Sequence, residues 1–152
     1  MSVERIYWDS DAFLGWLQNE SGKVELCKGT IERAEGGEIL IVTSALTLAE
    51  VLWLKGSPKI PQDKLMILRK FFRRSYVRVF NVTRTIAEDA QEVVMVHSIK
   101  PKDAIHVATA VNLKIQTLET FDKDLIAKSG TVGAPPLTIR KPLPPKQPKL
   151  DL

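Results

Sequence analysis

The residues of this sequence that could carry out chemistry are acidic side chains placed just after predicted strands or within the helices that follow them. They are Asp9, Glu50, Asp103, Asp122 and Asp124. In a parallel sheet covered by helices, active sites form beyond the carboxyl ends of the strands. These acids are far apart in the sequence, but such a sheet could bring them together at one edge.

Carboxylates that meet in one place repel each other, and without a counter-ion some of them would have to be protonated. A hard divalent cation removes this repulsion, and oxygen ligands favour Mg²⁺ or Mn²⁺. Mg²⁺ in proteins keeps several waters and usually binds phosphate oxygens of a substrate. The acidic set therefore predicts metal-assisted hydrolysis of a phosphate ester.

The segments that must position these acids alternate between strand and helix patterns. Short β-rich or continuously apolar runs predict strands at 3–8, 39–42, 77–82, 115–118 and 137–139. Apolar spacing and capping residues predict helices at 11–18, 21–35, 45–55, 61–75, 85–97, 102–113 and 122–128. This alternation predicts an α/β protein with a parallel sheet and helices on both faces.

Length and composition narrow the class of protein. A chain of 152 residues predicts one domain, placed at 1–140, and the four prolines of 141–152 predict an extended, lysine-containing tail. A single cysteine excludes a disulfide scaffold and a cysteine-based zinc site. No apolar run approaches the roughly 20 residues that span a bilayer, and the charged start does not resemble a signal peptide. We expect a soluble, cytoplasmic protein that does not associate with membranes.

Four segments around the acids resemble, in order and spacing, the four acidic motifs of PIN-domain nucleases. The segments are IYWDSDAFL, TLAEVL, KPKDAIHVATAV and TFDKDL, and together they span 6–125. The third is the most specific, because it combines an acid at a helix start with Ala-Ile-His-x-Ala-x-Ala. Many PIN domains are VapC-type toxin ribonucleases, each paired with an antitoxin.

The resemblance implies a three-layer α/β/α sandwich with a central, mainly parallel sheet, and RNA cleavage with Mg²⁺ or Mn²⁺. Asp9, Glu50, Asp103 and Asp122 match the family's metal-binding acids, and Asp124 matches its auxiliary acid. In this scheme Asp9, Asp103 and Asp122 hold one or two cations, and Glu50 and Asp124 are supporting or outer ligands. The implied partners are an RNA substrate, a cognate antitoxin protein and a second copy of the chain.

Several residues are candidates for substrate binding. Thr120 matches the hydroxyl residue that often precedes the family's last acids, and Ser10 lies beside Asp9. A basic segment around 59–74 contributes Arg69, Arg73 and Arg74, which form either a surface that follows RNA phosphates or a solvated helix face. The apolar residues of the same segment exceed what one core face needs, which indicates a homodimer or antitoxin contact.

Some residues have simpler interpretations. His106 shares a helix face with Asp103 and could support the site through one of the acids, but we expect it to be a packing or exposed residue. The tryptophans, Trp8, Trp16 and Trp53, are expected to be packing residues. Asp11 departs from the family pattern, and either adds a metal ligand or caps the helix that it begins.

Two other functions compete with the nuclease. Asp9-Ser10-Asp11 imitates the Asp-x-Asp motif of haloacid-dehalogenase-like phosphatases, with Asp9 as the nucleophile and Asp11 as the acid. That interpretation leaves Glu50 and Asp103 unexplained, and the chain is short for that fold. The third possibility is a non-catalytic PIN-fold module that binds RNA or protein, although a complete acidic set argues against it.

Overall fold

A five-stranded, entirely parallel sheet forms the centre of the protein, with strand order β5-β2-β1-β6-β7. The computed structural model describes residues 3–54, 57–58 and 60–145. The strands of this sheet are β1 (Glu4–Trp8), β2 (Ile39–Ser44), β5 (Val77–Phe80), β6 (Thr117–Glu119) and β7 (Thr138–Arg140). A second, antiparallel pair consists of β3 (Trp53–Leu54) and β4 (Ser57–Pro58).

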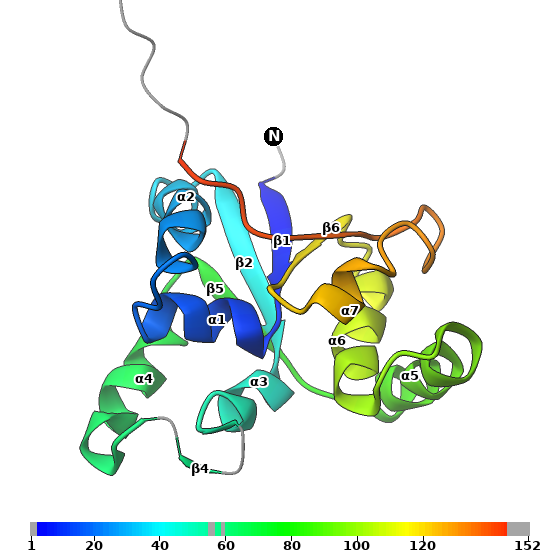
Figure 1. The fold of residues 1–152 in the computed structure, drawn as a ribbon, viewed down its shortest axis with the longest axis horizontal. Coiled ribbons are helices and arrows are strands. Elements are labelled where there is room, and N and C mark those ends of the chain that lie inside the picture. Colours follow the sequence, from blue (N-terminus) through cyan, green and yellow to red (C-terminus); the bar gives the residue numbers. More distant parts are fainter. Residues whose placement is uncertain (1–2, 55–56, 59, 146–152) are drawn as a thin grey trace, which may run out of the picture.

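Helices cover both faces of this sheet (Figure 1). One layer contains α1 (Ser10–Leu17), α2 (Val24–Glu35) and α4 (Leu65–Phe71), and the other contains α5 (Arg84–His97), α6 (Pro101–Asn112) and α7 (Lys123–Ile126). The short helix α3 (Ala45–Glu50) follows β2, and a 3₁₀ turn, η1 (Gln62–Lys64), precedes α4. The expected three-layer α/β/α sandwich with a parallel central sheet is confirmed.

The apolar runs of the strands are continuous because both faces of the sheet are buried. In β1, Ile6 and Trp8 point into the core beneath α1 and α2, whereas Tyr7 points into the core beneath α5 and α6. In β2, Ile41 and Val42 are divided between the two cores in the same way. Successive side chains of a strand face opposite sides, so one short apolar run serves two cores.

The strand order places a topological switch point beside the end of β1. The chain leaves β1 through α1 and α2 to reach β2 on one side, and later returns through α5 and α6 to β6 on the other side. Trp8 at the end of β1 is in register with Glu119 at the end of β6. Asp9 and Thr120, the next residues along each strand, therefore lie at the crevice where ligands bind in open α/β sheets.

Two predicted helices are shorter than expected. The helix predicted at 45–55 ends at Glu50, because Trp53 and Leu54 pair with β4 instead of continuing the helix. The helix predicted at 61–75 is divided into η1 and α4, and α4 ends at Phe71. Arg73 and Arg74 therefore follow the helix, whereas Arg69 lies within it.

Helix α5 begins at Arg84, one residue before the predicted start. Thr83 is its N-cap, with Oγ1 accepting a hydrogen bond from the Ile86 N–H at 3.2 Å. Glu88 pairs with Arg84 at 2.7 Å in the first turns of the helix. The backbone of Thr83 is in the β region, which suits an N-cap residue.

The chain beyond β7 crosses the outside of α2 (Figure 1). A Cβ atom at Gly29 would lie 2.9 Å from backbone atoms of Pro144 and Pro145, so this position of α2 has room only for glycine. Residues 146–152, most of the predicted tail, lie outside the described residues. None of the helices in the described part of the chain is both long enough and apolar enough to cross a membrane.

Candidate active site

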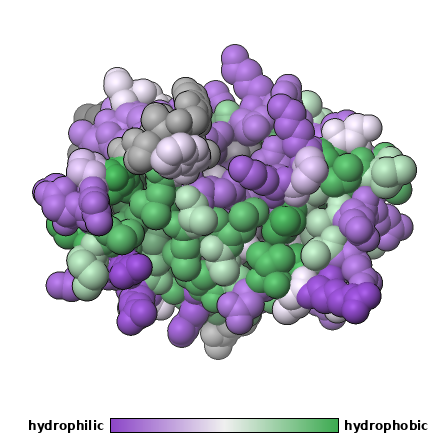
Figure 2. Space-filling view, turned by 90° about the horizontal axis from the view of Figure 1, so that it is seen from below, coloured by the Kyte–Doolittle hydropathy of each residue, from purple (hydrophilic) through white to green (hydrophobic). Residues whose placement is uncertain are grey.

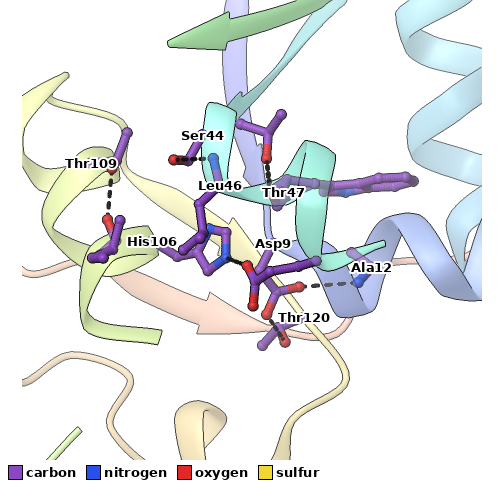
Figure 3. Close-up of polar contacts among 12 residues, drawn as sticks. Asp9, Ala12, Ser44, Leu46, Thr47, His106, Thr109 and Thr120 are labelled. Atoms are coloured by element: carbon purple, nitrogen blue, oxygen red, sulfur yellow. Dashed lines mark hydrogen bonds and ion pairs between the residues drawn. The ribbon is translucent and has the colours of Figure 1, made fainter. Parts of the chain in front are cut away.

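Asp9 is the most buried of the predicted acids, with 3% of its surface exposed. It directly follows β1 and is the N-cap of α1, where its Oδ1 accepts a hydrogen bond from the Ala12 N–H at 3.0 Å. Its other oxygen, Oδ2, accepts from the Thr120 hydroxyl at 2.5 Å (Figure 3). The carboxylate of Asp9, directly after β1, is thus hydrogen-bonded to Thr120, directly after β6.

Thr120 links Asp9 to Asp122. The Asp122 N–H donates to Thr120 Oγ1 at 3.1 Å, and that hydroxyl in turn donates to Asp9. Asp122 is the N-cap of α7, where its Oδ1 accepts from the N–H groups of Asp124 and Leu125 at 2.9 and 3.1 Å. Three predicted site residues therefore share one chain of hydrogen bonds, and Asp124 lies exposed in the first turn of α7.

Glu50 and Asp103 reach the same end of the sheet from α3 and α6. Asp103 is half-buried in the first turn of α6, which begins with Pro101. Glu50 is the last residue of α3, and its Oε1 lies 2.7 Å from Nε2 of His106. Nδ1 of His106 lies 2.7 Å from the Tyr7 hydroxyl. His106 is 1% exposed and hydrogen-bonded through both ring nitrogens, so it is a buried residue with polar partners and not an exposed one.

Burial determines the protonation of Asp9. The pKa of Asp9 is raised to about 7, mainly because burial removes the carboxyl group from water, and the nearby charge of Asp11 acts in the same direction. The neighbouring His106 and the hydrogen bonds from Thr120 and Ala12 act in the opposite direction. The favourable contacts therefore offset only part of the cost of burying this charge.

Like charges add to the effect of burial at Asp103. The pKa of Asp103 is raised to about 6, chiefly by burial and in addition by the charges of Asp122, Glu50 and Asp11, while His106 lowers it. The acids therefore lie close enough together to influence one another's ionisation. This is the repulsive cluster that the sequence predicted for the carboxyl edge of the sheet.

Three of the acids line one cavity of about 330 Å³ between α6 and α7. The acids are Asp103, Asp122 and Asp124, and the ammonium-bearing side chains of Lys100 and Lys128 belong to the same lining. Sequence reasoning did not single out either lysine. Their positions just before α6 and just after α7 follow from the packing of these two helices, which no local pattern reports.

The donor chemistry of this site fits a hard divalent cation. Carboxylate oxygens that repel one another are the ligands that Mg²⁺ and Mn²⁺ prefer. Among the described residues, however, no group of three or more His, Cys, Asp or Glu side chains is arranged closely enough to hold an ion. Asp9, Asp122 and Glu50 each accept hydrogen bonds, and a cation would use the lone pairs of their oxygens that these bonds leave free.

The predicted substrate-binding residues are divided between two places. Thr120 lies at the acids, and Ser10, the first residue of α1, is buried directly beside Asp9. Arg69, Arg73 and Arg74 are exposed at the end of α4, on the α1 side of the sheet. These arginines form a separate basic surface beside the site.

Two further residues depart from the sequence expectations. Trp53 is 59% exposed and not a packing residue. Glu119, which had no predicted role, is buried at the end of β6 and accepts from Trp8 Nε1 at 2.8 Å and Thr30 Oγ1 at 2.7 Å. Arg140 Nη2 lies 3.5 Å from its second oxygen. The Glu119 carboxylate therefore links β1, β6 and β7 to α2, and it lies in the core beneath that helix.

Acids gathered at the switch point of a parallel sheet define an α/β protein with an acidic site at the carboxyl edge. Residues 6–130 match the model of the PIN domain. The chain therefore belongs to the PIN domain family. A search of curated proteins found no match.

Solved structures share the fold at low sequence identity. The chain is similar to VapC20 of Mycobacterium tuberculosis, a sarcin-ricin loop cleaving toxin, with 21% identity and a TM-score of 0.63 over 80% of this chain and 93% of that one. It is similar to FitAcB from Neisseria gonorrhoeae, with 17% identity and a TM-score of 0.57 over 90% and 97%. It is also similar to FitAB bound to an IR36 DNA fragment, with 16% identity and a TM-score of 0.54 over 95% and 99%.

The raised pKa of Asp103 predicts how the stability of the metal-free protein depends on pH. The folded state holds the Asp103 proton more tightly than the unfolded state, so the free energy of unfolding falls as pH rises from about 4 to about 6. In the presence of a chelator, Asp103→Asn should therefore melt at a higher temperature than the wild type at pH 7, with the difference disappearing near pH 4. Thermal unfolding followed by circular dichroism measures both.

The matched control is Asp63→Asn, which changes an exposed acid of η1 outside this cluster. It should leave the pH profile of the wild type unchanged. If Asp103→Asn instead melts at or below the wild-type temperature at pH 7, the pKa of Asp103 is not raised in the folded protein.

Proposed function

We propose that this protein is a divalent-metal-dependent endoribonuclease that hydrolyses RNA phosphodiester bonds as the toxin of a toxin–antitoxin pair. The observation that carries the proposal is the cluster of acids at the switch point of a PIN fold, where burial and like charges raise the pKa values of Asp9 and Asp103. A purely structural role would not offset this repulsion, whereas a bound cation would.

In the proposed mechanism Asp9, Asp103 and Asp122 hold one or two Mg²⁺ or Mn²⁺ ions, with Glu50 and Asp124 as supporting or outer ligands. Such a cation, when bound, supplies a water of lowered pKa and stabilises charge on the leaving oxygen. The chain's own contribution is orientation, because a carboxylate with a fixed direction loses less entropy when it binds.

The hydrogen bonds of the site provide this orientation. The Ala12 N–H and the Thr120 hydroxyl fix the two oxygens of Asp9, and the N-terminus of α7 fixes Asp122. Lys100 and Lys128 line the cavity that contains Asp103, and their ammonium groups are suited to bind the oxygens of the scissile phosphate. The hydroxyls of Ser10 and Thr120 lie beside Asp9 and would contact the substrate next to it.

RNA beyond the scissile phosphate would follow the basic surface at the end of α4. Arg69, Arg73 and Arg74 are exposed there, and their charge is suited to the phosphate backbone. If these arginines are instead only a solvated helix face, they contribute nothing to the affinity for RNA.

The relatives support the assignment as a toxin. VapC20 is described as a toxin that cleaves the sarcin-ricin loop, and FitAB as a protein bound to DNA. We propose that this chain likewise has a partner protein, its antitoxin, which would be a separate chain. The proposed boundary of the catalytic domain stays at residue 140, with the tail beyond it.

The competing functions fit the geometry less well. Asp9 is buried, and both of its oxygens accept hydrogen bonds, which is a poor arrangement for the nucleophile of a phosphatase. A non-catalytic module would not need acids whose pKa values are raised by their neighbours. Both alternatives predict that RNA is not cleaved.

We also propose that two copies associate through the face at the carboxyl ends of the strands. Figure 2 views this end of the molecule and shows a broad apolar area across it. Leu48 of α3 and Phe80 at the end of β5 are 41% and 37% exposed, and Met95 of α5 is 82% exposed beside an apolar groove of about 550 Å³. Apolar areas of this kind mark interaction sites more often than free surface.

The nuclease proposal predicts metal-dependent RNA cleavage that fails in the acid variants. Wild-type protein should cleave a structured RNA pool with Mn²⁺ or Mg²⁺, and a chelator should stop it. Asp9→Asn and Asp103→Asn should each reduce the rate by about 100-fold or more, since a catalytic cation contributes several kcal/mol and each 1.4 kcal/mol is about tenfold. Asp63→Asn serves as the control with wild-type activity. Equal cleavage by wild type and Asp9→Asn would refute the proposal.

Charge reversal at Arg73 and Arg74 tests the basic surface. The double variant Arg73→Glu/Arg74→Glu should bind RNA more weakly and with a shallower dependence on salt, because each lost phosphate contact removes about 0.7 from the slope of log K against log salt. Binding measured by fluorescence anisotropy over a salt series gives both quantities. Arg84→Glu, at an exposed arginine of α5, is the control. An unchanged slope would favour the solvated-face interpretation.

The oligomeric state tests the apolar face. Sedimentation equilibrium of the wild type should give twice the mass of the 17.0 kDa chain. Met95→Glu should dissociate this dimer, because a charge would be buried in the apolar contact. Val3→Glu changes an exposed valine before β1, at the opposite end of the strands, and should leave the dimer intact. If the wild type is a monomer, the partner of this apolar face would be an antitoxin and not a second copy of the chain.

A further inference from the structure

A buried imidazole connects the catalytic edge to the core, although the proposed ligand set does not include it. His106 is 1% exposed, and its two ring nitrogens lie 2.7 Å from Glu50 Oε1 and 2.7 Å from the Tyr7 hydroxyl. The three side chains come from β1, α3 and α6. Tyr7 and His106 also make an edge contact, with ring centroids 5.7 Å apart.

Glu50 is poorly fixed by its own helix. Helix α3 has only six residues, Glu50 is the last of them, and Thr47 is the only fully buried side chain within it. A glutamate has three side-chain torsions, and their freedom is lost when the carboxylate is held in one place. The hydrogen bond from His106 holds this carboxylate at the site.

His106 and its partner Tyr7 lie on the same helix and strand that position two of the acids. It lies three residues after Asp103, so both side chains project from the same face of α6. Tyr7 lies two residues before Asp9, on the opposite face of β1 from Trp8, and is fully buried. The position of the ring is therefore set by the same strand and helix that set two of the acids.

We infer that His106 is a positioning residue that holds Glu50 by Oε1, so that the second oxygen of Glu50 is directed to the acids, and that Tyr7 holds the ring in place. This inference rests on the proposed metal-dependent function. A carboxylate only accepts hydrogen bonds, so Nε2 is the donor to Glu50. A tyrosine hydroxyl both donates and accepts, so it satisfies Nδ1 whether or not that nitrogen carries a proton.

Metal sites in general depend on the residues that hydrogen-bond to the metal ligands. Such partners fix the direction of a carboxylate, and their loss typically weakens metal binding by about 10- to 100-fold. Glu50 contributes to the repulsion at Asp103, which shows that its charge acts on the site. Release of Glu50 from His106 would allow its side chain to turn toward solvent, and the site would lose that charge.

The test is a double-mutant cycle measured with Mn²⁺ alone, by isothermal titration calorimetry on the full-length protein. The variants are His106→Leu, Glu50→Gln and the combination of the two. If His106 acts through Glu50, each single variant should bind Mn²⁺ about 10- to 100-fold more weakly. The double variant should be no weaker than the weaker single one, because coupled residues do not add. Additive losses would overturn the inference.

Three further variants separate positioning from folding. His106→Gln keeps an N–H donor close to the position of Nε2 and should recover most of the affinity lost in His106→Leu. Tyr7→Phe removes one hydroxyl from the core and should weaken Mn²⁺ binding by about fivefold, as expected for one hydrogen bond. His97→Leu, at the other histidine of the chain, should bind as the wild type does. Equal losses in His106→Gln and His106→Leu would overturn the inference.

The experiment also separates this inference from the proposed function. If the wild type does not bind Mn²⁺, the metal-dependent function itself fails, and the positioning role fails with it. If the wild type binds Mn²⁺ and Asp9→Asn does not, but His106→Leu binds normally, the metal site is correct and only the positioning role is wrong. Melting temperatures in chelator identify any variant that is unfolded, and Tyr7→Phe, the smallest change, then decides the outcome.

Discussion

The electrostatic repulsion among acids at the carboxyl edge of the sheet is the constraint on which the rest of the structure depends. Asp9 is almost fully buried, and Asp103 lies near Asp122, Glu50 and Asp11. Such an arrangement costs folding free energy unless other interactions offset it. The hydrogen bonds from Ala12 and Thr120 to Asp9 lower this cost but do not remove it, because the pKa of Asp9 is still raised to about 7.

The burial of apolar side chains in the two cores offsets this cost in folding free energy. Strands that are buried on both faces give each short apolar run two sets of contacts, with Ile6 and Trp8 in one core and Tyr7 in the other. Phe13 makes aromatic contacts with Trp8, Phe71 and Phe72, which join α1 and α4 to the sheet. The buried carboxylate of Glu119 accepts from Trp8 and Thr30, and this ties β6 to α2. Rigid neighbours of this kind keep the acids in place although they repel.

Two separate observations support each other. One is membership of the PIN domain family, and the other is the geometry of the site. The solved structures that share the fold are 16 to 21% identical, so the likeness concerns the path of the chain. The site rests on this chain's own residues: Asp9 and Thr120 on either side of the switch point, and Asp122 as the cap of α7. The lysines that line the cavity with Asp103 and the imidazole hydrogen-bonded to Glu50 are further parts of this site.

The sequence by itself determined the order of the strands and helices along the chain and the acids that follow them. Apolar runs and helix caps are local signals, so β1, β2 and α6 lie within a few residues of their predicted positions. Asp9, Asp103 and Asp122 could be chosen because their positions relative to strand ends and helix starts are also local. The helix at Ala45 was predicted too long, because the pairing of Trp53 with β4 overrides its helical pattern.

Only the tertiary structure decided which distant side chains meet. The contact between His106 and Tyr7 spans 99 positions of the sequence, and that between His106 and Glu50 spans 56. Glu119 likewise meets Trp8 and Thr30 only when β6 pairs with β1 beneath α2. Periodicity reports which face of an element is apolar, but the partner of a buried polar group depends on how three elements pack together, and no local pattern contains that information.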